Sequence, residues 1–488
     1  MTFLSKSKYL AGLQCSKLLW YQYNAKTEIP PVDAATQALF DQGHEVGELA
    51  KRLFSRGVEV GKGIVDFQPV LAQSRKALSL RKPLFESAFM QKNAYARADV
   101  LDPVGKDQWD IIEVKSSTEL KEVNLHDLAF QRYTFEGAGL KIRNCYLLYI
   151  NKEYVRQGAI DPRALFLRED VTGKVVELLP QVGKNLEGML EVIGKRKHPD
   201  TPIGPHCSDP YDCALEEICW AFLPRQNVTC MHRLGKKAFD LLGRGIQKIV
   251  DIPEDYRLSD TQAVQLDATK RGRPFVDREK IGEFLASLEY PLYFLDFETF
   301  GTAIPLFDNV RPYQQVPFQF SLHIVRSEGA KPEHHSYLSE NQSDPRPDIL
   351  RELSTLLGEK GSIIGYNAGF EKRLLRESCD VYMKYLPWFK GIEGRITDLL
   401  IPFRSFHYYH PLQEGSTSLK AVLPALTGKG YAGMEISEGS AASLEFLRVT
   451  FGTVSEAERE KVRAELLDYC GLDTSGMIQI VAALEELM

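Results

Sequence analysis

Two acidic side chains lie inside a strongly apolar run in the second half of the chain, FLDFETF (294–300). The run lies between Pro291 and Gly301 and is therefore predicted to be a buried strand. Side chains alternate along a strand, so Asp296 and Glu298, two positions apart, project from the same face. Burying two like charges together is costly unless a positive group compensates them. The pair therefore requires a positive partner.

Further acids follow along the C-terminal part of the sequence. Glu371 comes after the apolar strand and turn of SIIGYNAGFEKRLL, and Asp398 lies in RITDLL. In LLDYCGLDTSGM, Tyr469 and Asp473 are four residues apart and hence on one face of the last predicted helix. Ser455 and Glu458 have the spacing of a capping box at the start of that helix. Asp398 is expected to start a helix or accept hydrogen bonds rather than to bind a metal.

These motifs resemble those of the DnaQ-like (DEDD) 3′–5′ exonucleases of the RNase H-like fold. LDFET matches the first motif of that family, YNAGFE the second and YCGLD the third. The resemblance implies that Asp296, Glu298 and Asp473 bind two Mg²⁺ or Mn²⁺ ions, and that Tyr469 orients the attacking water. The second motif normally ends in aspartate, whereas this sequence has Glu371, whose longer side chain can still reach a metal. The missing positive charge would be this pair of metal ions.

A second set of acids lies in the N-terminal part of the chain. The stretch ARADVLDPVGKDQWDIIEVKSS predicts a hairpin with strands at about 95–101 and 109–115. Antiparallel pairing can bring Asp99 close to Glu113, which shares one strand face with Lys115. Two acids that bind Mg²⁺, beside a lysine that polarises a phosphate or a water molecule, form a hydrolytic site.

This hairpin resembles the core of the PD-(D/E)XK nucleases, with E-V-K as the E-x-K element. Gln131 and Tyr133 in DLAFQRY are similar to the glutamine motif that RecB-family members carry on the next helix. Glu86 in LFESAF lies where that family often has another acid. Many members also place a histidine in a G-x-x-V-H pattern, but this sequence has Gly47 there and His44 three residues earlier. Either the site lacks this ligand or His44 replaces it.

Three of the eight cysteines, Cys207, Cys213 and Cys219, recur with five residues between neighbours, and Cys15 lies far away near the start. One distant cysteine and a later trio resemble the iron–sulfur nucleases of the RecB family, in which a [4Fe–4S] cluster joins the two ends of the nuclease domain. A Zn²⁺ site on the same cysteines and unligated buried thiols are the alternatives. The remaining cysteines are expected to be ordinary interior or local residues: Cys145, Cys230, Cys379 and Cys470.

Between these two regions, HRLGKKAFDLLGRGIQKIVDIP contains the pattern L-L-x-x-G-I. It resembles half of a helix–hairpin–helix element, whose glycine turn presents backbone N–H groups to a DNA phosphate. A turn between two packing helices has the same pattern, so both interpretations stay open.

A chain of 488 residues predicts two or three domains. We expect an α/β multidomain protein with a RecB-like PD-(D/E)XK (restriction-endonuclease-like) domain at 1–225, a helical linker at 226–285 and an RNase H-like DEDD exonuclease domain at 286–488. The net charge of −6 gives no overall sign of nucleic-acid binding, and the basic clusters are short. No apolar run has the length of a membrane span and no signal-peptide core is present, which predicts a cytoplasmic protein without membrane contact.

The whole chain resembles a prokaryotic family of unknown function that joins a RecB-like region with a cysteine cluster to a DnaQ-like domain. The resemblance implies a metal-dependent DNA nuclease that acts on single strands or ends, in repair, recombination or defence against foreign DNA. One alternative is a nucleic-acid-binding adaptor in which one or both nuclease folds are inactive. The other is an exonuclease that processes RNA.

Overall fold

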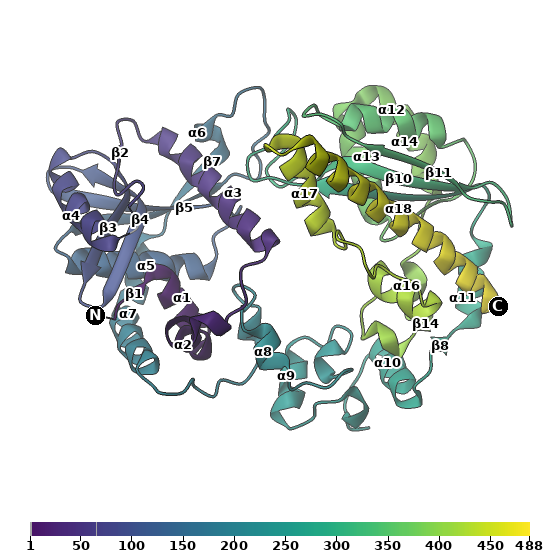
Figure 1. Ribbon diagram of the computed structural model, residues 1–488, viewed down its shortest axis with the longest axis horizontal. Coiled ribbons are helices and arrows are strands. Elements are labelled where there is room, and N and C mark those ends of the chain that lie inside the picture. The colour runs from purple at the N-terminus through teal and green to yellow at the C-terminus, as the bar shows by residue number, and fades with distance from the viewer. Residues whose placement is uncertain (1, 65) are drawn as a thin grey trace. The chain divides into compact units, whose positions relative to one another are not determined.

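The computed structural model describes residues 2–64 and 66–488 (Figure 1). The chain divides into two compact units, an N-terminal unit of Met1–Phe222 with Thr302–Tyr313, and a C-terminal unit of Leu223–Gly301 with Gln314–Met488. Both combine helices with a mixed sheet, so the predicted α/β multidomain class is confirmed. The segment predicted as a linker, 226–285, falls within the C-terminal unit. Within the described ranges, no helix is both long and apolar enough to cross a membrane.

A seven-stranded sheet forms the centre of the N-terminal unit within its described residues, in the order β2-β3-β4-β5-β6-β7, with β1 paired to β4. β3, β4 and β5 are antiparallel to one another, β6 is parallel to β5, and β7 is antiparallel to β6. The predicted hairpin is present as β4 and β5, with Val100 opposite Ile112. The strands are β1 (Leu4–Ser5), β2 (Val58–Glu59), β3 (Leu84–Gln91), β4 (Ala94–Val104), β5 (Gln108–Lys115), β6 (Lys141–Ile150) and β7 (Phe166–Asp170).

Hydrophobic clusters cover the two faces of this sheet. Ile111 belongs to the cluster formed with α1, α2, α5 and α7, whereas its neighbour Ile112 belongs to the cluster formed with α3 and Ala303. Because side chains alternate along β5, Glu113 and Lys115 project to the face that α1 and α5 cover. The helices are α1 (Lys6–Gln14), α2 (Ser16–Asn24), α3 (Ala34–Ala50), α4 (Phe67–Ala77), α5 (Glu122–Gly137), α6 (Pro162–Leu165), α7 (Thr172–Ile193) and α8 (Glu216–Trp220).

The described part of the C-terminal unit contains a five-stranded sheet in the order β11-β10-β9-β12-β13. β9, β10 and β11 form an antiparallel series, while β12 runs parallel to β9 and β13 runs parallel to β12. These strands are β9 (Leu292–Phe300), β10 (Val316–Val325), β11 (Glu333–Leu338), β12 (Ile363–Gly365) and β13 (Ile396–Asp398). A separate two-stranded sheet pairs β8 (Phe275–Val276) with β14 (Tyr408–Tyr409).

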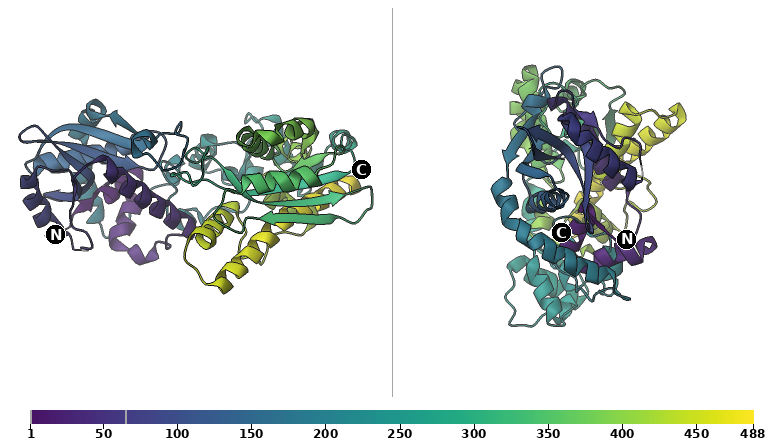
Figure 2. Two further views of the ribbon diagram at one scale, coloured as in Figure 1. Left: turned by 90° about the horizontal axis from the view of Figure 1, so that it is seen from above. Right: turned by 90° about the vertical axis from the view of Figure 1, so that its left-hand side faces the viewer.

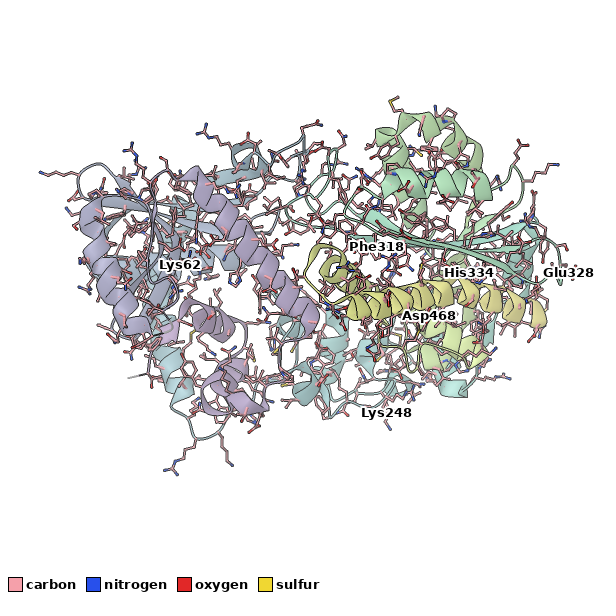
Figure 3. All side chains as sticks on the ribbon, turned by 45° about the horizontal axis from the view of Figure 1, so that its top comes forward. Lys62, Lys248, Phe318, Glu328, His334 and Asp468 are labelled. Atoms are coloured by element: carbon pink, nitrogen blue, oxygen red, sulfur yellow. The ribbon has the colours of Figure 1, made fainter. Side chains whose placement is uncertain are left out.

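Helices cover both faces of the larger sheet, as the left view of Figure 2 shows. Leu295 on β9 packs with α12, α13 and α14, whereas Phe294 packs with α18. Phe318 on β10 (labelled in Figure 3) stacks on Phe446 of α17 with ring centroids 3.9 Å apart. The helices are α9 (Lys236–Gly243), α10 (Asp260–Arg271), α11 (Arg278–Ala286), α12 (Arg346–Leu356), α13 (Gly369–Val381), α14 (Leu386–Ile392), α15 (Ile401–Arg404), α16 (Leu419–Thr427), α17 (Gly439–Phe451) and α18 (Glu456–Glu486).

The start of the last helix is as predicted. Ser455 is the N-cap of α18, and its hydroxyl accepts a hydrogen bond from the Glu458 N–H at 3.3 Å. The 31 residues of α18 bury Tyr469 and Asp473 on the side that packs against the sheet. The N-cap residue that the sequence indicates is therefore the residue at which α18 starts.

The helix–hairpin–helix interpretation of the middle segment requires a correction. Helix α9 ends in a turn at Gly245, which has a positive φ of 81°. A single 3₁₀ turn, Ile249–Asp251, follows instead of a second α-helix, and α10 begins only at Asp260. A helix that continued from the turn at Gly245 would contain Pro253 in its interior, where proline removes a hydrogen bond and clashes with the preceding turn.

Candidate functional site

Four acidic side chains of the C-terminal unit converge beside β9. Asp296 and Glu298 lie on the strand, Glu371 in the first turn of α13, and Asp473 on α18. Except for Asp296, which is partly exposed, they are buried, with 4–6% of their surface exposed. Burial, followed by the charges of Asp473, Glu298 and Glu371, raises the pKa of Asp296 well above its ordinary value. The structure thus brings together the carboxylates of all three sequence motifs.

These carboxylates have no positive neighbour in direct contact. In the described part of the chain, no lysine, arginine or histidine nitrogen lies within 4.0 Å of their oxygen atoms. Burial, followed by the charge of Asp473, raises the pKa of Glu298 to about 8, and burial also raises that of Asp473 to about 6. Four acids held this close without an ion pair provide the oxygen ligands and the negative charge that hard divalent cations require.

Glu371, which stands where the resembled family has aspartate, has an unused buried oxygen. Its Oε2 atom has no hydrogen-bond partner among the described residues, and burial raises the pKa of the side chain to about 8. A Cβ atom at Gly365 would lie 3.2 Å from this oxygen, so the glycine leaves room for the longer glutamate. A buried acceptor without a partner is destabilising unless a ligand binds it.

Asp398 accepts backbone hydrogen bonds, as predicted. Its Oδ1 atom accepts from the N–H groups of Asn367 at 2.9 Å, Ala368 at 3.3 Å and Leu400 at 3.0 Å. Its Oδ2 atom accepts from Arg404 at 3.2 Å. With both oxygens engaged, Asp398 orders the turn before α13 rather than facing a ligand.

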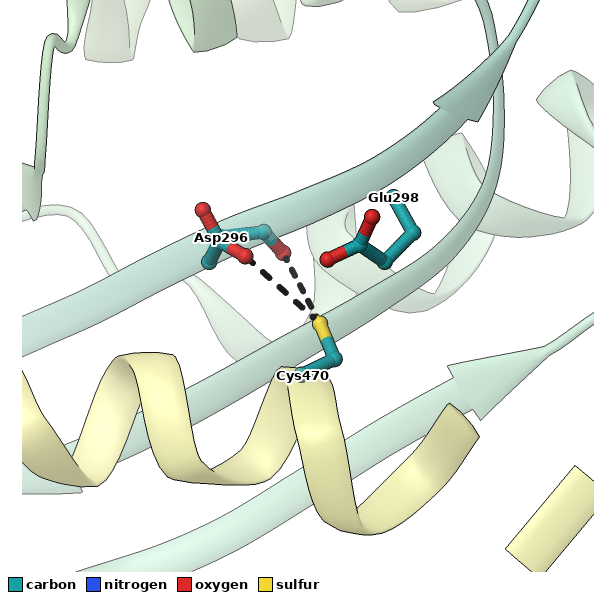
Figure 4. Close-up of side chains that lie close together, drawn as sticks. All are labelled: Asp296, Glu298 and Cys470. Carbon is teal, nitrogen blue, oxygen red and sulfur yellow. Dashed lines mark hydrogen bonds between the residues drawn. The ribbon is translucent and has the colours of Figure 1, made fainter. Parts of the chain in front are cut away.

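Cys470 lies directly against the acids, although it was expected to be an ordinary interior residue. Its Sγ atom is 3.7 Å from Oδ2 of Asp296 (Figure 4). Asp296, Glu298 and Cys470 each present one ligand atom within 4.8 Å of the others, and no other three His, Cys, Asp or Glu residues in the described ranges do so. Asp473 and Glu371 stand outside this tight group. Two-metal sites hold their ions about 3.5–4 Å apart, so the ligands of different ions are not all mutual neighbours.

Two further side chains, Tyr431 and Lys420, lie at this centre, and neither belongs to a sequence motif that predicted it. Tyr431 donates a hydrogen bond from its hydroxyl to Oδ1 of Asp473. Lys420 on α16 places its Nζ atom 5.2 Å from the ring centroid of Tyr469 and 5.7 Å from that of Tyr431. The charge of Lys420 lowers the pKa values of Glu298 and Asp473, but burial outweighs it. Among the residues that the structure describes, Lys420 is therefore a cation near this centre that forms no ion pair with its acids.

Three acids lie side by side on β3, β4 and β5 of the N-terminal unit. The pairing of β3 with β4 places Glu86 beside Asp99, and that of β4 with β5 places Asp99 beside Glu113. Asp99 accepts a hydrogen bond from the Val114 N–H at 2.7 Å. Burial, followed by the charge of Asp99, raises the pKa of Glu86 to about 7. Glu86 also has a positive φ of 56°, a backbone conformation that costs free energy in a residue other than glycine.

Two lysines neutralise much of this second centre. Lys115 donates to Oε1 of Glu113 at 2.7 Å and to Asp127 at 2.8 Å. Gln131 on α5 donates to Oε2 of Glu113 at 2.7 Å and to Asp127 at 2.9 Å. Lys6 donates to Oε1 of Glu113 at 2.6 Å. Burial alone would raise the pKa of Glu113, but Lys115 and Lys6 outweigh it and hold that pKa below its ordinary value.

The contacts of this centre include Lys6 and Asp127, which were not predicted, and leave out His44. Lys6 lies at the start of α1, and Asp127 lies one turn before Gln131 on α5. His44 is exposed on α3, and within the described residues it forms no hydrogen bond or ion pair with the acids. The substitution of His44 for the missing histidine is therefore not supported by any contact.

The four predicted cysteines come together. Cys15, Cys207, Cys213 and Cys219 line one small cavity, together with residues that include His206. Cys15 is the residue between α1 and α2 and the N-cap residue of α2. Burial raises the pKa of Cys15, and it raises that of Cys213 to about 11. Thiols in this setting stay protonated until a metal displaces the proton.

The chain is similar to a protein family and to a protein for which no activity is assigned. The family described as "Domain of unknown function (DUF2779)" matches residues 293–418, a range that contains Asp296, Glu298 and Glu371 but ends before Tyr469 and Asp473. A 241-residue stretch is 22% identical to the uncharacterized protein MG366 of Mycoplasma genitalium, and the match covers 46% of this chain. The chain spans only 36% of that relative's length.

Among solved structures, the protein named SSO0001 matches 46% of this chain and 88% of its own chain, at 13% identity and a TM-score of 0.21. A TM-score this low does not establish a shared fold.

Proposed function

We propose that the protein is a metal-dependent nuclease whose C-terminal unit removes nucleotides from the 3′ end of a nucleic-acid strand. The observation that carries this proposal is the set of four converging carboxylates with raised pKa values and no ion pair among the described residues. Their order along the chain and their places on a central strand, a strand–helix turn and a late helix support the likeness to DnaQ-like exonucleases of the RNase H-like fold.

Asp296, Glu298 and Asp473 would hold two Mg²⁺ or Mn²⁺ ions, and Glu371 would complete the set. Bound metal ions would activate the attacking water and stabilise the charge on the leaving oxygen. Tyr469, one helical turn before Asp473, would orient that water through its hydroxyl group. Tyr431 holds the Asp473 carboxylate by the hydrogen bond that it donates, and so fixes one ligand before any metal binds.

The N-terminal unit supports a second nucleolytic site of the RecB-like PD-(D/E)XK type. Asp99 and Glu113 would bind one or two metal ions, and Lys115 would stabilise the charge that develops on the phosphate. Gln131, buried on α5, orients Glu113. The row of acids across three strands, with the lysine two positions after Glu113, supports this assignment.

The cysteine centre supports a [4Fe–4S] cluster over zinc. A tetrahedral zinc site with Zn–S bonds of about 2.3 Å needs sulfur atoms roughly 3.8 Å apart. In the described structure, no three of these cysteine sulfurs lie within 4.8 Å of one another. An iron–sulfur cluster places several metal atoms between its ligands and requires this wider spacing. The proposed ligands are Cys15, Cys207, Cys213 and Cys219.

The test is digestion of end-labelled single- and double-stranded DNA and RNA with Mg²⁺ or Mn²⁺. Progressive shortening of 5′-labelled single-stranded DNA, stopped by EDTA, is the expected result. Faster shortening of RNA would identify an RNA-processing enzyme. Binding without shortening under either metal would contradict the proposal and favour an adaptor with inactive nuclease folds.

A further inference from the structure

Lys6, the first residue of α1, brings a second ammonium group to the N-terminal acid centre. Its Nζ atom is 2.6 Å from Oε1 of Glu113 and 3.6 Å from Oδ1 of Asp127. Lys115 donates to the same Oε1 atom at 2.7 Å. Gln131 donates to the other oxygen, Oε2, at 2.7 Å. Both oxygens of the Glu113 carboxylate are therefore already engaged by hydrogen-bond donors.

A divalent cation needs a lone pair of Glu113 that points at the ion. A carboxylate oxygen has two lone pairs, and the Lys6 and Lys115 ammonium groups, which offer donors only, occupy both lone pairs of Oε1. Two positive groups within a few ångströms of a divalent ion also repel it. At least one ammonium group must therefore leave Oε1 before a metal ion can bind there.

Lys6 is the more weakly held of the two ammonium groups. Lys115 has two carboxylate partners, Glu113 at 2.7 Å and Asp127 at 2.8 Å. Lys6 has one carboxylate partner at hydrogen-bond distance, Glu113 at 2.6 Å, and a longer ion pair with Asp127 at 3.6 Å. Both side chains are about a quarter exposed, 25% for Lys6 and 24% for Lys115, so the looser hold on Lys6 follows from its distance to Asp127 and not from exposure. The flexible stem can swing outward while the backbone stays in place.

The backbone under Lys6 is fixed independently of the acids. Ser5 caps α1 by accepting a hydrogen bond from the Lys8 N–H at 3.4 Å. Strand β1 directly precedes the helix, and Leu4 pairs with Ala94 on β4. Only the side chain of Lys6 has to move for its ammonium group to leave the carboxylate.

The centre also contains an unused acceptor that suits a cation. Gln131 is fully buried, and its Oε1 atom has no hydrogen-bond partner within the described residues. A buried amide oxygen without a partner is costly, and amide oxygens are ligands for hard divalent cations, directly or through water. The Gln131 amide therefore keeps one acceptor free beside the two hydrogen bonds that its Nε2 atom donates to Glu113 and Asp127.

We propose that Lys6 is a built-in counterion of the N-terminal centre, and that a divalent cation binds at Glu113 by displacing the Lys6 ammonium group. The inference rests on the proposed function, in which this centre binds Mg²⁺ or Mn²⁺. Lys6 is a positioning residue: it holds the Glu113 carboxylate in place while no metal is bound, and it sets how much metal is needed to load the site.

The test is a Mn²⁺ titration followed by electron paramagnetic resonance, with no nucleic acid present. The full chain carries Asp296→Asn and Glu298→Gln, so that ions at the C-terminal centre do not dominate the signal. Lys6→Met should bind Mn²⁺ about tenfold more tightly, because one nearby charge typically shifts such an equilibrium by a factor of ten or more. Lys6→Gln should change the affinity in the same direction, and Lys6→Arg should bind like the parent.

Lys8→Met is the matched control, since Lys8 lies on the same helix and contacts the Tyr23 ring instead of the acids. It should leave the Mn²⁺ affinity unchanged. Glu113→Gln should abolish the N-terminal site and so assign the measured ion to it. The inference is overturned by unchanged or weaker binding in both Lys6→Met and Lys6→Gln, or by a parent chain that binds no Mn²⁺ at this centre. Because the readout is ion binding, a failure here is distinct from a failure of the digestion experiment.

Discussion

The two acid centres of this chain are compensated in opposite ways. Glu113 in the N-terminal unit is 1% exposed, yet two lysines hold its pKa below the ordinary value. Glu298 in the C-terminal unit is 6% exposed, and its pKa is raised to about 8. The more deeply buried glutamate is thus the one that stays ionised. Neighbouring charge, rather than depth of burial, decides the state of these carboxylates.

This difference indicates how each centre is held together without metal. The N-terminal centre is a network of hydrogen-bonded ion pairs, in which Asp127 and Gln131 complete the contacts of Glu113. The C-terminal centre has like charges facing one another and an unpartnered oxygen on Glu371. We therefore expect removal of charge to stabilise the C-terminal centre and to destabilise the N-terminal one.

The largest expected effect is on the activity of the C-terminal centre. The double variant Asp296→Asn, Glu298→Gln should lose 3′-end hydrolysis by about 10³-fold, because removing a single group that stabilises the transition-state charge already costs about 10²- to 10³-fold. In EDTA it should be at least as resistant to urea as the parent, since the like-charge repulsion is gone. The measurements are initial rates on 5′-labelled single strands and urea unfolding curves.

Asp468→Asn is the control for this loss. Asp468 is an exposed acid on α18, one residue before Tyr469 (Figure 3). Its replacement should leave the rate unchanged. Retention of 3′-end activity in the double variant would show that the unpaired acids do not carry the reaction.

Loss of the cysteine centre should destabilise the N-terminal unit and leave the C-terminal unit unchanged. Roughly 190 residues lie between Cys15 and Cys207, so a shared cluster would close a very long loop and remove much denatured-state entropy. Protein prepared without oxygen should be brown, and Cys15→Ala should be colourless. Its N-terminal unit should lose on the order of 3 kcal/mol or more of stability, since metal ligation contributes directly to folding.

Hydrogen–deuterium exchange checks where Cys15→Ala acts. Exchange should accelerate in β4 and β5 and stay unchanged in β9, and 3′-end activity should persist. Cys230→Ala is the control that should keep the colour, because Cys230 is not among the residues that line the cavity. A colourless parent protein with one tightly bound zinc would instead establish the alternative cofactor.

The stability of the two units in EDTA should depend on pH in different ways. Glu298 and Glu371 have pKa values of about 8 in the folded chain, raised from an ordinary value of 4.5. They take up protons on folding, so their contribution is full below pH 4.5 and is lost as the pH rises towards 8. Between pH 6 and pH 8 the C-terminal unit should lose about 5 kcal/mol, because each of the two groups contributes about 1.4 kcal/mol per pH unit until it ionises near pH 8.

Urea unfolding at pH 6 and pH 8 measures this loss, with hydrogen–deuterium exchange of the β9 amides as the readout for the C-terminal unit. Saturating Mn²⁺ should remove most of it at pH 8. Glu371→Gln should reduce it in EDTA. Glu113 makes no contribution in this range, because its lowered pKa places its loss of stability in acid. A C-terminal unit that gains stability from pH 6 to pH 8 would contradict the raised pKa values.

Replacing Lys115 should have a smaller effect: removal of this charge should destabilise the N-terminal unit. Lys115→Met removes the one of the two lysines that lies within hydrogen-bond distance of both Glu113 and Asp127, and leaves Lys6 with them. The N-terminal unit should lose about 2 kcal/mol, less than for a fully buried pair because the lysine is partly exposed. Any cleavage activity that remains in the Asp296→Asn, Glu298→Gln background should disappear with it.

Lys62→Met is the control for this variant, since Lys62 is an exposed lysine of the same unit (Figure 3). Identical product ladders for Lys115→Met and the parent would make the N-terminal centre structural rather than catalytic.

Strand and helix patterns predicted the parts of both centres that depend on local geometry. The period of two along β9 places Asp296 and Glu298 on one face, and four-residue spacing on α18 does the same for Tyr469 and Asp473. Asp398 accepts three backbone hydrogen bonds, as its position before a helix suggested.

Residues that tertiary packing supplies could not be predicted in this way. Lys6 and Lys8 are equivalent in the sequence SKSK, yet one reaches Glu113 and the other lies over Tyr23. The choice depends on the pairing of β1 with β4, which joins residues about 90 positions apart and leaves no local pattern. Tyr431 likewise lies in a short glycine-rich stretch, GKGYAGM, that indicates only a loop.

The smallest expected effect concerns this tyrosine. Tyr431 donates to Asp473 and favours its ionised form, so Tyr431→Phe removes one support of a proposed metal ligand. The loss of one such hydrogen bond, about 1 kcal/mol, predicts a roughly fivefold lower kcat at pH 7. The pKa of Asp473 should rise above its value of about 6, so the defect should shrink at higher pH, where the carboxylate ionises without help. KM should not change, because Tyr431 contacts the proposed metal ligand Asp473.

Tyr385→Phe, which removes a hydroxyl elsewhere in the C-terminal unit, should leave the pH–rate profile unchanged. A Tyr431→Phe defect that is the same at every pH would mean that the tyrosine only supports the packing around Asp473 and does not control its charge.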